Sequence, residues 1–354
     1  MKRNPYTLLF GKEPAQMISR NAEITTVLES FQNTENPQQV YIITGVRGTG
    51  KTVMMTEISR KLKENREWLI VELNPEKDLL QMLGAALSAE TQWAQLFQSA
   101  DINLSFFGFG LAVKGAAPIT DIEIALAKML EVLKKHGKKV LITIDEAANT
   151  KEMRTFVSAF QILIRKDLPV FLLMTGLYEN INDLQNEKSL TFLYRAPKIE
   201  LKPLNLRTIA ENYQSKLSVD EETSLKMARL TKGYSFAFQV LGYFTYENGS
   251  WNSKVLSDYR QYLNQYSYEK IWTELSDKDK FVVYGIAKTN SRKISEIRSF
   301  LKLETNQFNP YRMRLIRKGI VNGDRYGYLS FTLPLFEDFA VDTYETENET
   351  YETL

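Results

Sequence analysis

The hydrophobic positions of this chain follow two different spacings. Short continuous runs rich in β-branched residues predict buried strands, and segments with apolar residues every three or four positions predict helices. The predicted strands cover residues 40–44, 68–73, 140–145, 170–175 and 198–201. The clearest helix covers residues 122–135, where Leu126, Met129 and Leu133 share one stripe before a stop at His136-Gly137. This alternation indicates an α/β domain with a parallel sheet flanked by helices.

The pattern changes after residue 275. It predicts helices over residues 276–287, 293–301 and 309–318, and then a hairpin with a glycine turn over residues 321–331. Ser276 and Asp279 resemble a capping box at the start of the first of these helices. Asn309-Pro310 fits the first two positions of the third helix, although an irregular start a few residues earlier fits as well, and Gly319 ends it. Three short helices followed by a β-ribbon are typical of a winged helix-turn-helix.

One apolar segment punctuated by glycine lies between the second and third predicted strands. Residues 104–113, LSFFGFGLAV, predict a β-hairpin. Two interpretations stay open for it, a protrusion that binds a partner and a hairpin packed on the core of its own domain.

The composition of the chain sets the expected number of domains and excludes several kinds of metal and catalytic site. The 354 residues predict two or three domains, because domains average about 150 residues. The absence of Cys excludes disulfides, thiolate zinc sites and cysteine nucleophiles, and the single His136 excludes multi-histidine metal centres. The first residues lack a secretory apolar region, and no segment approaches 18 uninterrupted apolar residues, so we expect a cytoplasmic protein without a membrane span.

The net charge of +2 hides a contrast near the C-terminus. Residues 276–336 contain twelve Lys and Arg against five Asp and Glu, whereas residues 337–354 contain seven acidic residues and no basic one. We expect the acidic tail to be solvated and disordered.

The most specific motif follows the first predicted strand. GVRGTGKT, residues 45–52, matches G-x-x-x-x-G-K-[ST] in full. Its glycines let successive backbone N–H groups point inward at the start of a helix, which favours bound phosphate, while the Lys side chain reaches the β- and γ-phosphates and the Thr hydroxyl is placed for Mg²⁺. The expected nucleotide-binding residues are Gly45, Val46, Arg47, Gly48, Thr49, Gly50, Lys51, Thr52 and Val53.

Two carboxylates end the third predicted strand and supply the second half of such a site. Asp145 is expected to hold Mg²⁺ together with Thr52, and Glu146 to polarise the water that attacks the γ-phosphate of ATP. An Asp-Glu pair after a strand is also common as a helix N-cap, which is the alternative interpretation of these residues.

The order of phosphate loop, one intervening strand, acid strand and following strand resembles the AAA+ division of P-loop ATPases. Within it, the chain is similar to archaeal-type ATPases and Orc1/Cdc6-like proteins, which carry a helical lid and a winged helix after the ATPase core. The opening of the chain over residues 4–14 also resembles uncharacterised bacterial ATP-binding proteins. The resemblance implies a P-loop ATPase domain over residues 1–203, a helical lid over 204–272, a winged-helix domain over 273–336 and the acidic tail over 337–354.

The resemblance also implies roles for single residues. Residues 17–20, ending in Arg20, would pack on adenine, Thr175 would sense the γ-phosphate, and Arg195 would contact phosphate in its own chain or a neighbour's. A surface ion pair is the alternative for Arg195. Ser235 and Phe236 stand where the lid of related proteins frequently has an arginine, so ATP hydrolysis is expected to be slow.

The third C-terminal helix and the hairpin carry the cations expected to bind duplex DNA. In a winged helix-turn-helix the third helix enters the major groove, and the cations here are Arg312, Arg314, Arg317 and Lys318, with Arg325 on the hairpin. The alternative is a basic helix in a domain that makes protein contacts or dimerises.

Three functions follow from these residues. The first is an ATP-dependent switch whose ATP or ADP state controls DNA binding. The second is a signalling or defence ATPase of the STAND-like kind that self-assembles or binds a protein partner. The third, ranked last, is a P-loop kinase, which has less use for Glu146 and none for a basic C-terminal domain.

Overall fold

The computed structural model describes residues 3–8, 16–33, 35, 37–109 and 117–352. The chain divides into two compact units. One unit, the sheet unit, consists of Arg20–Thr44 and Lys51–Glu200. The other, the helical unit, consists of Met1–Ser19, Gly45–Gly50 and Leu201–Leu354.

The sheet unit is built on a five-stranded parallel sheet in the order β2-β3-β4-β1-β5. The strands are β1 (Val40–Thr44), β2 (Trp68–Leu73), β3 (Lys139–Ile144), β4 (Val170–Gly176) and β5 (Lys198–Glu200). Every residue of β1 and β4 is buried, as expected for central parallel strands covered on both faces. The five predicted strands are therefore confirmed, with ends that agree within one residue.

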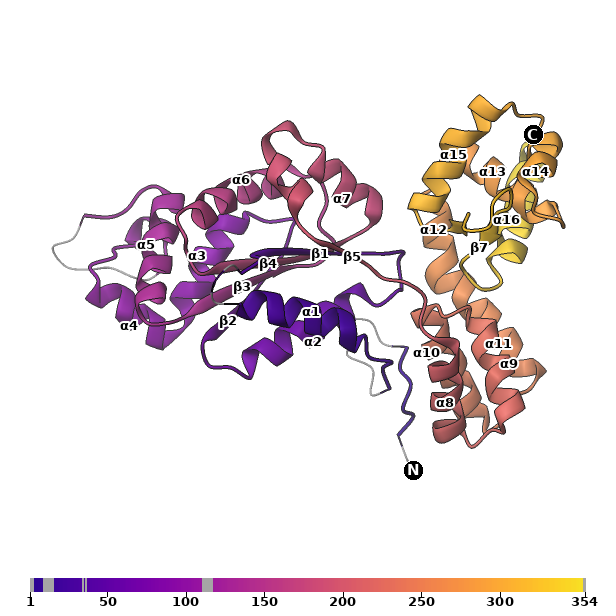
Figure 1. Cartoon of the computed structure of the whole chain (residues 1–354), viewed down its shortest axis with the longest axis horizontal. Helices are drawn as coiled ribbons and strands as arrows, with labels where there is room; N and C mark the ends of the chain where they lie inside the picture. The colour runs from indigo at the N-terminus through magenta and orange to yellow at the C-terminus, as the bar shows by residue number, and fades with distance from the viewer. Residues whose placement is uncertain (1–2, 9–15, 34, 36, 110–116, 353–354) are drawn as a thin grey trace. The chain divides into compact units, whose positions relative to one another are not determined.

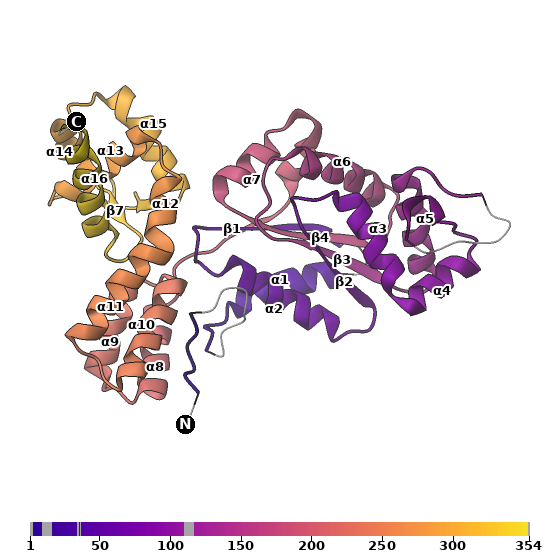
Figure 2. The ribbon, with the colours of Figure 1, turned by 180° about the vertical axis from the view of Figure 1, so that it is seen from behind.

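Helices cover both faces of this sheet, with α1 and α2 on one face and α3 and α6 on the other (Figure 1, Figure 2). The helices of the unit are α1 (Asn21–Gln32), α2 (Lys51–Lys63), α3 (Leu79–Ala89), α4 (Thr91–Ser99), α5 (Ile122–Lys135), α6 (Lys151–Arg165) and α7 (Tyr178–Gln185), with 3-10 turns η1 (Ser105–Phe107) and η2 (Lys188–Arg195). Helix α5 has the predicted bounds because the Asp121 carboxylate caps its first turn and His136-Gly137 end it.

The predicted hairpin over residues 104–113 is wrong for the part that the structure describes. Residues 110–113 lie outside the described residues, and residues 104–109 contain the turn η1 instead of a strand. The Asn103 side chain accepts hydrogen bonds from the Ser105 N–H at 3.1 Å and its hydroxyl at 2.7 Å. This local pairing nucleates a helical turn, which ends at Gly108 with φ of 72°.

The helical unit begins with four helices around an aromatic core. They are α8 (Leu206–Leu217), α9 (Glu221–Thr231), α10 (Ser235–Asn248) and α11 (Ser253–Leu263). Asn205, Asp220 and Asn252 cap three of them through side-chain oxygens. Tyr213 and Phe238 are buried in the core with ring centroids 5.3 Å apart.

After α11, the described part of the helical unit contains a π-turn, four helices, a short two-stranded ribbon and a terminal helix. The elements are the π-turn η3 (Asn264–Tyr268), α12 (Glu269–Thr273), α13 (Asp277–Lys288), α14 (Ile294–Leu301), α15 (Thr305–Arg317), β6 (Val321–Asn322), β7 (Ser330–Phe331) and α16 (Phe336–Glu352). Strands β6 and β7 are antiparallel, and Lys293 pairs with Tyr328 in an isolated bridge. The three predicted helices and the hairpin are all present, and Ser276 caps α13 as expected.

Helix α15 does not begin at Asn309-Pro310 but four residues earlier than Asn309, which agrees with the alternative start. The helix begins at Thr305 because Glu304 and Gln307 form a capping box. Pro310 then lies inside the helix, where its missing N–H leaves the carbonyl of Asn306 without its usual partner. Both residues are exposed, so water can satisfy that carbonyl.

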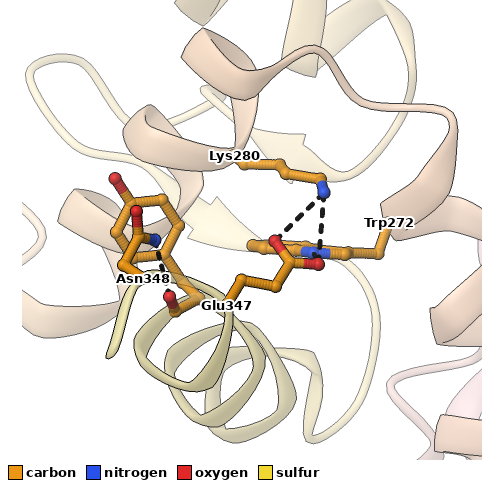
Figure 3. Close-up of polar contacts among 5 residues, drawn as sticks. Trp272, Lys280, Glu347 and Asn348 are labelled. Atoms are coloured by element: carbon orange, nitrogen blue, oxygen red, sulfur yellow. Dashed lines mark hydrogen bonds and ion pairs between the residues drawn. The ribbon is translucent and has the colours of Figure 1, made fainter. Parts of the chain in front are cut away.

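The expectation of a disordered acidic tail is also wrong. Residues 336–352 form α16, which buries Phe336, Phe339 and Ala340. Near its far end, Glu347 accepts hydrogen bonds from the Trp272 indole at 3.0 Å and the Lys280 ammonium at 3.1 Å (Figure 3). The acidic residues therefore find cationic partners within the helical unit, and the apolar residues between them anchor the helix.

Within the described ranges, the chain offers no helix of the length and apolar character that crossing a lipid bilayer requires.

Candidate functional site

The glycine loop over residues 45–50 connects β1 to α2. Gly48 and Gly50 have φ angles of 80° and 92°, a conformation that favours glycine. The loop is tightened by Thr49, whose N–H and hydroxyl both donate to the Val46 carbonyl, at 3.3 Å and 2.8 Å. The backbone of the motif thus makes the sharp turn that an anion-binding nest requires.

The residues that follow the loop begin α2 within the sheet unit. Lys51 is the first residue of α2 and is buried, with 9% of its surface exposed. The Thr52 hydroxyl donates a hydrogen bond of 2.8 Å to Oδ2 of Asp145. The first N–H groups of an α-helix have no partner within the helix itself, and its N-terminus carries the positive end of the helix dipole.

The Asp145 carboxylate joins three parts of the sheet unit. It directly follows β3, and its Oδ1 accepts hydrogen bonds from the Thr175 hydroxyl and from the Glu146 N–H at 3.1 Å. Thr175 lies in β4, fully buried, and its hydroxyl also accepts from the Glu146 N–H at 3.2 Å. Because β4 lies between β1 and β3 in a parallel sheet, the ends of these strands meet at one edge, which is where ligands of such sheets bind. The structure therefore brings Thr52, Asp145 and Thr175 together.

Glu146 has an unusual backbone. Its φ is 54°, in the left-handed region that non-glycine residues rarely adopt. Two acceptors hold its N–H in place, the Asp145 carboxylate and the Thr175 hydroxyl. Its side chain is exposed. Left-handed strain of this kind costs about 1–3 kcal/mol and concentrates at functional sites.

Arg195 and Arg20 have different surroundings. Arg195 ends η2, just before β5, and is exposed; among the described residues its side chain makes no ion pair. The surface ion pair considered for it is therefore not seen. Arg20 precedes α1 and its side chain is only 11% exposed, with Glu23 at 3.8 Å. Burial lowers the pKa of Arg20.

The carbonyl groups of the glycine loop accept hydrogen bonds from a segment that is distant in the sequence. Within the helical unit, three consecutive loop carbonyls accept hydrogen bonds from residues 234–236, which we name the clamp segment. The Tyr234 hydroxyl donates to the Arg47 carbonyl at 2.7 Å, the Phe236 N–H to the Gly48 carbonyl at 3.1 Å, and the Ser235 hydroxyl to the Thr49 carbonyl at 2.9 Å. Ser235 and Phe236, which stand where the lid of related proteins frequently has an arginine, thus contact the loop backbone.

Loop side chains also contact the C-terminal part of the helical unit. Arg47 forms a 3.1 Å ion pair with Glu274, between α12 and α13. Val46 packs against Gly319, where an added Cβ would lie 2.4 Å from its Cγ2. The glycine loop is therefore connected to both ends of the α13–α15 segment.

The cations of α15 are only partly available. Arg314 forms a 3.0 Å ion pair with the buried Asp279 of α13 and lies over the Tyr311 ring. Arg312 is half-buried, Arg317 is exposed, and Lys318 is half-buried. On the ribbon, the Arg325 guanidinium stacks on the Tyr328 ring at 3.9 Å. Arg314, expected on a DNA-binding face, thus has a partner inside the chain.

Two segments of the chain match known protein families. Residues 17–171, less than half of the chain, match the family described as "ATPase domain predominantly from Archaea", and residues 265–340 match a domain of unknown function, DUF8462. No curated protein matches the sequence.

Solved structures share the fold at low sequence identity. The Walker-type ATPase PABY2304 of Pyrococcus abyssi is 15% identical with a TM-score of 0.67, over 92% of this chain and 96% of the other. The Orc2 protein of Aeropyrum pernix, in ADPNP and ADP complexes, is 13% identical with a TM-score of 0.63, over 98% of each chain. The chain therefore has the fold of the AAA+ P-loop ATPases, as the resemblance implied, and the family match to an archaeal-type ATPase domain covers residues 17–171.

Proposed function

We propose that this protein binds ATP with Mg²⁺, hydrolyses it slowly, and uses its nucleotide state to control DNA binding by the α13–α15 segment and its ribbon. The observation that carries the proposal is the Thr52–Asp145–Thr175 cluster, in which the last residue of a complete phosphate-loop motif, Thr52, is hydrogen-bonded to the carboxylate of Asp145. The family match to an ATPase domain and the shared fold support it.

The residues of the cluster fit a magnesium ion. A hydroxyl and one carboxylate are hard oxygen ligands, and Mg²⁺ usually takes one or two protein oxygens plus nucleotide phosphates and water. Thr52 and Asp145 would hold the ion, which when bound neutralises negative charge on the phosphate oxygens. No group of three or more His, Cys, Asp or Glu suited to a metal occurs among the described residues, which agrees with a metal held largely by the nucleotide.

The chemistry that we assign to the chain is hydrolysis of the terminal phosphoanhydride. The loop N–H groups and the Lys51 ammonium would bind the β- and γ-phosphates, and Thr175 would orient the γ-phosphate. Glu146 would orient a water molecule and accept its proton as the oxygen attacks the γ-phosphorus. The bond to the bridging oxygen then breaks, and ADP and inorganic phosphate leave.

Phosphate release with water as the only acceptor tests this reaction. The Glu146→Gln variant should lose at least tenfold in turnover while still binding ATP, because the amide cannot accept the proton. Glu152→Gln, an exposed carboxylate in the first turn of α6, is the matched control. Equal turnover of Glu146→Gln and wild type would remove Glu146 from the mechanism, and a wild type that needs an added acceptor would favour the kinase.

DNA binding is the part of the proposal that depends on the C-terminal cations. We propose the α13–α15 segment with its ribbon as a winged helix, because three helices precede a two-stranded ribbon and an isolated antiparallel bridge joins Lys293, just before α14, to Tyr328, just before β7. Arg317 and Arg325 would contact phosphates, since neither forms an ion pair with a described residue. Duplex affinity should fall with salt, with log K decreasing by about 0.9 per phosphate contact for each unit of log salt concentration. An affinity for duplex DNA that does not change with salt concentration would refute DNA binding by these cations.

One observation favours the second candidate, a self-assembling or protein-binding ATPase. The seven acidic residues of 337–354 balance the net charge of +7 of residues 276–336, and α16 pairs with Lys280, Lys288 and Arg292. Internal pairing of this kind leaves fewer cations for DNA. Sizing with ADP and with an ATP analogue, without DNA, separates the candidates, because only self-assembly predicts a nucleotide-dependent change of mass.

A further inference from the structure

The clamp segment bonds to the carbonyl side of the glycine loop. Each of its three residues uses a different donor, the Tyr234 hydroxyl, the Ser235 hydroxyl and the Phe236 N–H, and each donor reaches a different loop carbonyl. All six residues belong to the helical unit. The clamp therefore fixes three successive peptide groups of the loop.

The peptide geometry connects these carbonyls to the phosphate-binding side of the loop. A trans peptide is planar, so its C=O and the N–H of the next residue point in opposite directions. Holding the carbonyls of Arg47, Gly48 and Thr49 on one side therefore directs the N–H groups of residues 48–50 to the other side. An anion nest depends on this alignment of successive N–H groups.

Burial and two hydrogen bonds hold the Tyr234 side chain in one position. Its side chain is buried, and its hydroxyl is bonded to the Ser267 hydroxyl at 2.8 Å as well as to the Arg47 carbonyl. Burial raises the pKa of Tyr234 well above its ordinary value, so the hydroxyl keeps its proton and remains a donor. Gly48 fits closely against it, because an added Cβ would lie 2.2 Å from the Tyr234 oxygen.

We propose that Tyr234 is a positioning residue for nucleotide binding, acting through the backbone of the glycine loop rather than by touching the nucleotide. In this arrangement the clamp segment orients the loop N–H groups for phosphate binding, and it does so in the lid region where related proteins frequently have an arginine. By reciprocity, bound nucleotide strengthens the clamp. The inference rests on the proposed function, because it assumes that the loop binds a nucleotide.

The test compares two tyrosine variants of the full chain. Tyr234→Phe removes the hydroxyl that reaches the loop, and Tyr213→Phe removes one that is equally buried and donates to the Phe238 carbonyl at 2.8 Å within the four-helix core. Titration with fluorescent ATP and ADP analogues should show about fivefold weaker binding for Tyr234→Phe, which is about 1 kcal/mol because 1.4 kcal/mol is tenfold. Tyr213→Phe should bind like the wild type.

A role in folding alone would give a different pattern. Both tyrosine variants would then lower the melting temperature to a similar extent and leave affinity unchanged, which would overturn the inference. In steady-state hydrolysis, Tyr234→Phe should raise KM about fivefold and change kcat less than twofold, as expected when a ground-state binding contribution is lost.

A serine pair supplies an independent second variant. Ser235→Ala removes the bond to the Thr49 carbonyl, and Ser224→Ala removes a buried hydroxyl bonded to the Glu221 carbonyl in α9. Only Ser235→Ala should weaken nucleotide binding. Normal binding by both Tyr234→Phe and Ser235→Ala would overturn the inference and leave the proposed function intact, whereas a wild type that binds no nucleotide would refute the proposed function itself.

Discussion

The Thr175→Val substitution tests whether the Asp145 carboxylate is positioned by its neighbours. The change keeps the branched shape and removes a fully buried hydroxyl that donates to Asp145. A hydrogen bond to a charged group contributes about 1.5–3 kcal/mol. The substitution also removes the hydrogen bond that the Glu146 N–H donates to the Thr175 hydroxyl. This loss costs little, because the same N–H still donates to Oδ1 of Asp145 at 3.1 Å. We expect the free energy of unfolding of the sheet unit to fall by about 2 kcal/mol.

Urea unfolding followed by far-ultraviolet circular dichroism measures this change. Ser88→Ala in the same unit is the matched control, because it removes a buried hydroxyl that donates to a neutral carbonyl, that of Gly84, at 2.7 Å. It should cost about 1 kcal/mol. A double-mutant cycle with Thr52→Val should show coupling of at least about 0.5 kcal/mol, because Thr52 and Thr175 donate to the two oxygens of one carboxylate. A loss below 0.5 kcal/mol for Thr175→Val would refute this account of the cluster.

Three further predictions follow from the loop and the terminal helix. Gly48→Ala should weaken ATP binding at least tenfold in fluorescence titration, because φ of 80° and the 2.2 Å approach to Tyr234 both exclude a Cβ; unchanged affinity would contradict it. Phe336→Ala should lower the free energy of unfolding by about 3–5 kcal/mol in urea, since the ring is fully buried; a cost below 1 kcal/mol would indicate a solvated tail. Hydrogen bonds from Lys288 and Tyr284 lower the pKa of Glu345, so its stabilisation exists above its ordinary pKa of 4.5 and is lost as pH falls below it. The melting temperature of Glu345→Gln should therefore lie below that of wild type at pH 7 and approach it below pH 4.5, and a pH-independent difference would exclude Glu345 as the cause.

The parts of the fold that were predictable have local signals in the sequence. Strands β1 to β4 of the sheet unit are short, mostly apolar runs, and α5 carries both its Asp121 cap and its Gly137 stop. The glycine loop and the Asp145-Glu146 pair were recognisable because their chemistry fixes residue types at fixed spacing.

The features that were missed depend on contacts distant in sequence or on competition between local signals. The acidic composition predicts a disordered tail, but Phe336 and Phe339 are buried in the core of the helical unit. Glu347 pairs with Lys280, which lies 67 residues earlier in the sequence. At α15, a capping box at Glu304 overrides the Asn309-Pro310 signal.

The clamp segment is the part of the site that was least accessible from the sequence. Its acceptors are backbone carbonyls, which every residue carries, and its donors lie 186 to 188 residues away from them. Side-chain pattern alone does not specify such a pairing. The packing of α10 and the bond between Tyr234 and Ser267 create it.

The most direct test of the central claim, that the glycine loop with Lys51 binds a triphosphate with magnesium, is calorimetric titration of ATP in the presence of Mg²⁺ into the wild type and the Lys51→Ala variant. Lys63→Ala, an exposed lysine at the end of the same helix, is the control. We predict that the wild type and Lys63→Ala bind ATP alike and that Lys51→Ala binds at least tenfold more weakly. Equal ATP affinity for the wild type and Lys51→Ala would contradict the account.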